Sequence, residues 1–169
     1  MGGASRCTPH SQPDPPQPGL CFHLMNLTHD QMEAETEFHQ LAVGYCVKRQ
    51  RVKLDLSQEE LALRCHLSRG EVQHIEHARH ALREPTRRRL CLGMGLSELE
   101  LVAEVGRTEM AWAICGVPED AEMPKSLAVK LRQLGALMEG ERTPPPCPSV
   151  MTPALLYLWI RAYGSTQGR

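Results

Sequence analysis

A group of hydrogen-bonding residues lies on one predicted helix near the middle of the chain. The segment from Ser68 to His77 carries Arg69, Gln73 and His74 on the face opposite its apolar residues, with the small Gly70 beside them. Guanidinium and amide groups can donate to base edges in the major groove of DNA, and a small residue allows close approach. The pattern therefore indicates contact with a nucleic acid.

Histidines and a cysteine around the same segment raise the question of a metal site. His74, His77 and His80 are spaced by three, and Cys65 and His66 lie nearby. A zinc site needs three or four converging ligands, and His80 is expected to lie beyond the helix. We therefore interpret these histidines as exposed or phosphate-facing, and predict no metal site.

No arrangement of residues in the sequence is typical of a catalytic site. The sequence has no Gly-rich phosphate loop, no HExxH and no nucleophile elbow, and its Cys and His residues are dispersed. We expect no enzymatic activity and no cofactor.

Two predicted helices with capping boxes position the segment from Ser68 to His77. Ser57-Gln58-Glu59-Glu60 reads as a capping box that opens a helix to about Cys65. Ser68-Arg69-Gly70-Glu71 repeats the pattern and opens the next helix, to about His77. Apolar and small residues (Leu61, Ala62, Cys65, Val72 and Ile75) then fall on the faces where the two helices would meet. Two capped helices this close together predict a helix-turn-helix.

Composition and charge agree with a helical, DNA-binding protein. Aromatic residues are sparse, at 4%, which favours an all-α fold over a β-sandwich. Residues 40–95 carry eleven Lys and Arg against six Asp and Glu, whereas the whole chain has a net charge of −1. A basic middle with acidic flanks suits a phosphate backbone, although a solvated helix surface is an equal alternative.

The cysteines and the hydropathy indicate the cellular compartment of the protein. The seven cysteines are scattered and odd in number, without a CxxC pair, and this favours a reducing cytoplasm. No apolar run is long enough for a membrane span, and no secretory signal is evident. We expect a cytoplasmic protein with no membrane contact.

The chain divides into five predicted segments. A Pro-rich flexible arm covers residues 1–27, and a helical domain capped at Thr28 or Asp30 covers 28–106, with short helices at 83–94 and 97–105. The remaining three segments are a helical extension at 107–142 (helices at 108–115 and 125–139), a Pro-rich linker at 143–150 and a C-terminal helix at 151–169. The last helix either closes the core or packs on a second subunit.

The central segment resembles the Cro/repressor-type (XRE) helix-turn-helix family over roughly residues 47–105. The resemblance rests on Leu56-Ser57-Gln58, the Glu-Glu-Leu-Ala run, the Leu67-Ser68 turn and Ile75-Glu76. It also rests on Leu90-Cys91-Leu92-Gly93-Met94-Gly95-Leu96-Ser97, which is similar to the family's closing Leu-Ala-x-Ala-Leu-Gly-Val-Ser. It implies a five-helix repressor-like domain, here followed by a helical C-terminal extension.

The resemblance also implies roles for single residues. The groove-facing positions are Ser68, Arg69, Gly70, Gln73 and His74, with Arg69 the strongest candidate for reading a guanine. Phosphate contacts are implied for Gln58, His77 and Arg79. Arg51 would point inward to pair with Glu76, a structural pair that does not touch DNA.

Three positions depart from the family pattern. Asp55, His66 and Ala78 stand where glycine is usual. Asp and His tolerate positive φ better than most residues, so we expect the turns to form at some cost in stability.

Two functions remain open at this stage. The first is a dimeric transcriptional regulator, a repressor among the possibilities, that reads double-stranded DNA with residues 68–77. The alternative is a protein-interaction module, antitoxin-like or an adaptor, that keeps the fold without reading DNA. The C-terminal helices would then hold a protein partner.

Overall fold

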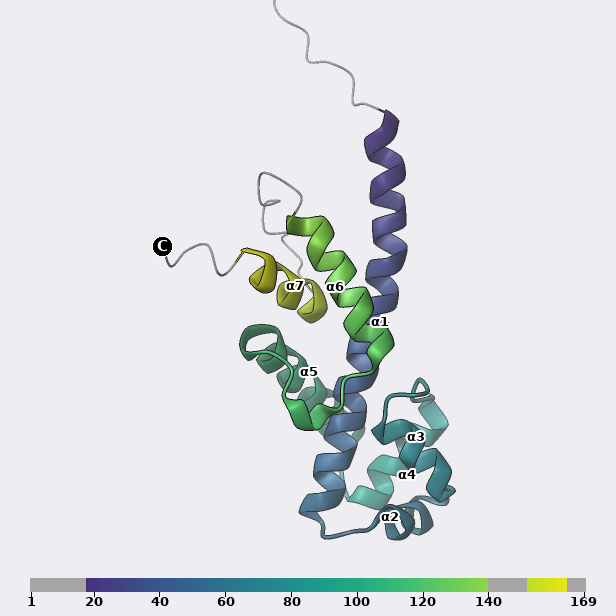
Figure 1. Cartoon of the computed structure of the whole chain (residues 1–169). Helices are drawn as coiled ribbons and strands as arrows, with labels where there is room; N and C mark the ends of the chain where they lie inside the picture. The colour runs from purple at the N-terminus through teal and green to yellow at the C-terminus, as the bar shows by residue number, and fades with distance from the viewer. Residues whose placement is uncertain (1–17, 140–151, 164–169) are drawn as a thin grey trace, which may run out of the picture.

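The chain is built from helices packed side by side (Figure 1). The computed structural model describes residues 18–139 and 152–163, and this part of the chain contains seven α-helices and no strand. The helices are α1 (Pro18–Lys53), α2 (Gln58–Cys65), α3 (Arg69–Glu76), α4 (Glu84–Met94), α5 (Glu98–Cys115), α6 (Lys125–Glu139) and α7 (Pro153–Tyr163), with the short 3₁₀ helix η1 (Glu119–Ala121) between α5 and α6. The all-α fold class is confirmed.

The start of α1 differs from the sequence prediction. The helix begins at Pro18, so residues 18–27 are helical and not part of a flexible arm, and Thr28 and Asp30 lie inside the helix. Proline at the first helical position loses no hydrogen bond, and residues 20–27 contain no proline or glycine that would end a helix. Residues 1–17 of the expected arm and the expected linker at 143–150 lie outside the described residues.

The second difference concerns α5. The sequence predicts a break at Gly106, but α5 runs without interruption from Glu98 to Cys115. Glycine inside a helix costs about 1 kcal/mol relative to alanine. Burial of Val105 and Trp112, on either side of Gly106, offsets that cost.

Two hydrophobic clusters hold the helices together. The first cluster belongs to α1–α4 and contains Val47, Leu56, Leu61, Ala62, Cys65, Val72, Ile75, Leu90 and Met94. The second cluster joins the middle of α1 to α5, α6 and α7, and its largest residues are Phe38, Leu41, Leu127 and Trp112. Helix α1 contributes to both clusters and therefore connects the two halves (Figure 1).

Helices α6 and α7 form where the sequence predicts them. Thr152 caps α7, because its hydroxyl accepts from the Leu155 N–H at 3.4 Å. Ala154 and Leu158 of α7 are each 3% exposed, and α7 packs on α1, α5 and α6. Helix α7 thus packs on the core of its own chain, and its expected contact with a second subunit stays a prediction.

No helix in the described ranges is both long and apolar enough to cross a membrane.

Candidate nucleic-acid interface

Capping boxes set the starts of α2 and α3. The Glu60 N–H donates to the Ser57 hydroxyl at 3.1 Å, and the Ser57 N–H donates to the Glu60 carboxylate at 2.7 Å. Ser68 and Glu71 repeat both bonds at the same two distances. These bonds lower the pKa of both glutamates, chiefly through the serine backbone N–H. The predicted capping boxes are confirmed, and they fix the two helices relative to the turn between them.

The three turns of the domain keep the geometry that glycine usually provides. Asp55, His66 and Ala78 have φ values of 54°, 52° and 54°, all in the left-handed region. These are the three positions at which the sequence departs from the family pattern. The left-handed conformation costs a non-glycine residue about 1–2 kcal/mol. The turns therefore form without glycine, and the chain carries that strain at three sites.

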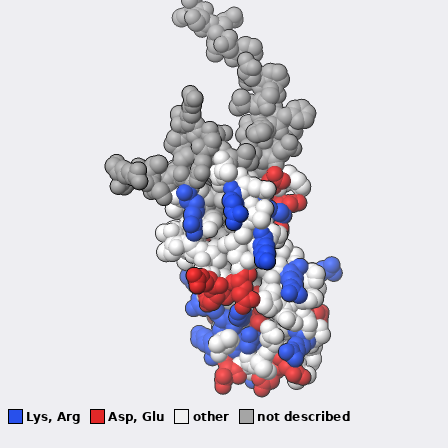
Figure 2. Space-filling view, viewed as in Figure 1, with Lys and Arg blue, Asp and Glu red and all other residues white. Residues whose placement is uncertain are grey.

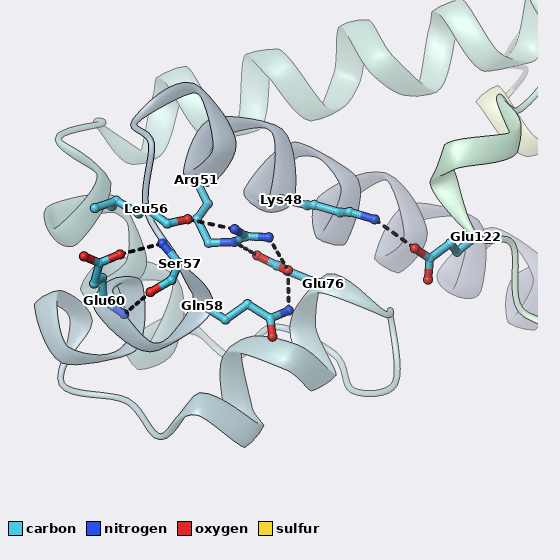
Figure 3. Close-up of polar contacts among 8 residues, drawn as sticks. All are labelled: Lys48, Arg51, Leu56, Ser57, Gln58, Glu60, Glu76 and Glu122. Atoms are coloured by element: carbon cyan, nitrogen blue, oxygen red, sulfur yellow. Dashed lines mark hydrogen bonds and ion pairs between the residues drawn. The ribbon is translucent and has the colours of Figure 1, made fainter.

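A buried ion pair joins the end of α1 to the end of α3 (Figure 3). Arg51 donates to both carboxylate oxygens of Glu76, at 2.6 and 3.1 Å, and also to the Leu56 carbonyl at 2.8 Å. The Glu76 side chain is only 2% exposed. The expected structural pair is thus present, and it fixes the angle between α3 and the rest of the domain.

Gln58 takes part in the same network. Its side-chain amide donates to Glu76 at 2.8 Å, so the carboxylate receives a third hydrogen bond (Figure 3). Gln58 was predicted from the sequence to contact a backbone phosphate, and its contact with Glu76 was not predicted. An amide has a second N–H, so a phosphate contact stays a prediction for Gln58.

Two glycines allow the helices to approach closely. A Cβ on Gly44 of α1 would lie 2.4 Å from the Ile75 carbonyl oxygen at the end of α3. A Cβ on Gly93 of α4 would lie 2.3 Å from the Cys65 sulfur of α2. Both positions leave no room for a side chain, and they bring α1 and α4 against the two motif helices.

The outward face of α3 carries the predicted base-reading residues. Arg69, Gly70 and Gln73 are exposed, and neither long side chain has a hydrogen-bond or ion-pair partner among the described residues. His74 is half-buried, and its ring packs edge-on against His80 with the centroids 5.0 Å apart. The Ser68 hydroxyl, in contrast, is occupied by its capping box. The base-reading roles stay predictions.

Unpaired arginines surround α3. Arg64 at the end of α2 and Arg79 and Arg83 in the segment after α3 have no hydrogen-bond or ion-pair partner within the described part of the chain. A cavity of about 640 Å³ beside α3 is lined in part by His74 and Arg83. Among these arginines, only Arg79 was predicted from the sequence to contact a phosphate. No local pattern distinguishes Arg64 or Arg83, because Arg64 has Glu60 one helical turn away and Arg83 adjoins Glu84.

The three arginines at positions 87–89 form ion pairs and hydrogen bonds within the fold. Arg87 pairs with Glu98 at 2.8 Å, and Arg88 pairs with Glu84 and Glu98. Arg89 donates to the His66 carbonyl oxygen at 2.9 Å and so stabilises the turn of the motif. The cations of this run have internal partners, unlike those around α3.

An acidic turn lies against the end of α3. Glu122, directly after η1, binds Lys48 of α1 at 2.9 Å and His77 at 3.1 Å. Lys48 holds the pKa of Glu122 below its usual value, with a smaller contribution from His77. Figure 2 shows acidic side chains gathered over this turn, with basic ones beside them. His77 was predicted from the sequence to contact a phosphate, and its contact with Glu122 was not predicted. The phosphate role of His77 stays a prediction.

No group of three or more potential metal ligands occurs in residues 18–139 and 152–163.

Comparison with known proteins gives one match. Residues 47–101 match the family model described as "Helix-turn-helix", and this range covers α2, α3 and α4 together with the adjoining ends of α1 and α5. No match was found among the curated proteins or among the solved structures.

Proposed function

Because residues 47–101 form a helix-turn-helix domain of the Cro/C1 type (the XRE family), we propose that this protein regulates transcription by binding specific double-stranded DNA sequences. Helix α3 would enter the major groove. The observation that carries the proposal is the contrast between two sets of arginines. Those around α3 form no ion pair or hydrogen bond within the described part of the chain, whereas the run in α4 is paired within the fold.

Base reading would come from the exposed side of α3. Arg69 follows the N-cap directly, so its guanidinium is carried at the end of the helix that enters the groove. A guanidinium can donate twice to one guanine edge, which makes Arg69 the main determinant of base preference. Gln73, one turn later and also unpaired, would read a neighbouring base.

Backbone contacts would come from the flanks. Arg64, Arg79 and Arg83 extend from segments on either side of α3, and each would neutralise a phosphate. Release of counterions should then make the affinity fall steeply as salt is added.

The regulatory role has further consequences for the protein. Regulators of this kind read paired half-sites as two-fold dimers, so we expect a homodimer on DNA. Binding, and not catalysis, would be the activity, and occupation of a promoter would act as repression. The protein would work inside the cell, where its buried thiols Cys46, Cys65 and Cys91 stay reduced.

The test compares variants of an arginine on α3 with one elsewhere. Arg69→Ala should cost roughly 1–3 kcal/mol at the preferred site and relax the preference there. Arg132→Ala removes an exposed arginine of α6 and should leave both quantities unchanged. Fluorescence anisotropy with selected and scrambled duplexes measures both.

A folded protein that binds every duplex equally weakly, with an affinity that Arg69→Ala does not change, would favour the alternative function as a protein-interaction module.

A further inference from the structure

Helices α6 and α7 lie beyond the helix-turn-helix domain and pack against each other with a groove between them (Figure 1). The groove has a volume of about 450 Å³, and its apolar lining includes Met123, Leu131 and Tyr157. Two arginines also line it, Arg132 from α6 and Arg161 from α7. We call this cavity the α6–α7 groove. It combines apolar surface with cationic side chains from both of its helices.

The cations beside the groove form no ion pair within the described part of the chain. Arg132 is exposed and makes no hydrogen bond there, and neither does Lys125, which lies two helical turns earlier on the same side of α6. Arg161 is also exposed, and its guanidinium lies over the Tyr157 ring, 5.3 Å from the centroid. Figure 2 shows basic side chains spaced over α6 and α7 with no acidic side chain between them.

The other side of α6 shows the contrast. Lys130 faces α1, where its ammonium group bonds Glu33 at 2.8 Å and Glu37 at 2.6 Å. The chain therefore supplies carboxylates for the cation that packs against α1 and none for the cations at the groove. An anionic group from another molecule would complement them.

The lining narrows the choice of ligand. A guanidinium can bind a carboxylate through two parallel hydrogen bonds, so Arg132 and Arg161 suit Asp or Glu side chains. Small residues of α6, Ala128 and Gly135, leave space beside Leu131 for an apolar side chain. A phosphate backbone could use the arginines, but it has no apolar group to cover the rest of the lining. A protein segment that carries both acidic and apolar residues matches all of it.

We propose that the α6–α7 groove binds an acidic segment of a partner protein. Carboxylates of that segment would bind Arg132 and Arg161, and an apolar side chain between them would enter the groove. The proposal gives the protein partner expected at the C-terminal helices a site and a chemistry. It does not depend on DNA reading, because the groove lies outside residues 47–101 and shares no residue with α3.

A peptide selection with the full chain as bait tests the recognition chemistry. Phage that display random peptides should be enriched for sequences with at least two Asp or Glu residues and an apolar residue between them. The anisotropy of a labelled copy of an enriched peptide then gives its dissociation constant, which should rise as salt is added. A selection that enriches no peptide, or only peptides without acidic residues, would overturn the proposal.

Charge reversal locates the bound peptide. Arg132→Glu and Arg161→Glu should each raise its dissociation constant at least about tenfold, because a carboxylate loses a charged hydrogen-bond donor and meets a like charge. Arg69→Glu makes the same change on α3 and should leave the dissociation constant unchanged. Arg132 has no contact to lose within the described residues, so its variant should stay folded, as circular dichroism checks. Equal effects of all three variants, or none from the two groove variants, would contradict the proposal.

Charge exchange separates direct pairing from an indirect effect on structure. The enriched peptide with its acidic residues replaced by lysine should bind the wild type poorly. It should regain affinity for the double variant Arg132→Glu/Arg161→Glu, because each lysine then meets a carboxylate. A distorted groove could not produce this recovery. Its absence, with the double variant folded, would refute the pairing.

DNA binding separates this inference from the proposed function. A protein that binds the acidic peptide through the groove but prefers no duplex would contradict the function alone. A protein that selects a specific duplex, and whose affinity for every acidic peptide is unchanged by Arg132→Glu, would contradict the inference alone. Single-stranded DNA that displaces the peptide from the wild type and binds Arg132→Glu more weakly would assign the groove to a nucleic acid, and this too would overturn the inference.

Discussion

Replacing Arg51 by methionine removes one partner of the buried ion pair and leaves the other in place. The two side chains are 13% and 2% exposed, so Glu76 would be left buried without a counterion. Breaking a buried pair in this way costs roughly 3–5 kcal/mol. The hydrogen bond from Gln58 to Glu76 is present in the wild type as well, so it does not offset this loss. Against a typical folding free energy of 5–15 kcal/mol, the loss would bring the domain close to unfolding.

The double variant Arg51→Met/Glu76→Leu is the matched control. It removes both charges and replaces them with apolar side chains, which proteins often tolerate at no net cost. We expect its free energy of unfolding to lie within about 1 kcal/mol of the wild type, because half-buried Gln58 can turn to water. Urea titration followed by circular dichroism measures all three proteins.

The pair points inward, so its loss should not change base preference. The double variant should therefore select the same DNA as the wild type. Two results would refute the reasoning: a cost below 1 kcal/mol for Arg51→Met, or no recovery in the double variant. Either would mean that the ion pair does not hold α3 in place.

Three further changes test the turns, the helix contacts and the caps. Ala78→Gly should stabilise the fold by about 0.5–1 kcal/mol by relieving the left-handed strain at φ 54°, as a shift in the thermal midpoint would show. Gly44→Ala should destabilise it by several kcal/mol (~3), because the added methyl meets carbonyl oxygens at the end of α3; urea titration measures the loss. The pKa values of Glu60, Glu71 and Glu100 are lowered by their capping serines, so their contribution is complete above their unfolded-state pKa and lost as pH falls through the folded values. Urea titrations at stepped acid pH should show this decline, and glutamine variants should flatten it.

Local hydrogen bonding explains which parts of the fold were predictable from sequence. Ser57 and Ser68 cap helices through residues three positions away, so α2 and α3 were located within a residue or two. The positive φ values at Asp55, His66 and Ala78 followed from a family pattern that places glycine there.

Tertiary packing explains the errors. Gly106 is a helix-weakening residue, but buried neighbours on α5 outweigh its local preference. The contact of Gln58 with Glu76, and that of Glu122 with His77, join residues far apart in the sequence. No local pattern indicates either contact. The exposure of Arg69, Gly70 and Gln73 was predictable because it follows from helical periodicity, whereas their base-reading roles stay predictions.

Sequence-specific binding through α3 is best tested by selecting bound DNA from a random pool, because the selection measures binding and supplies the site together. We expect enrichment of a two-fold symmetric sequence, with a base position in each half-site that loses its preference in Arg69→Ala. A pool that shows no enriched sequence after repeated rounds, with the protein folded throughout, would contradict it.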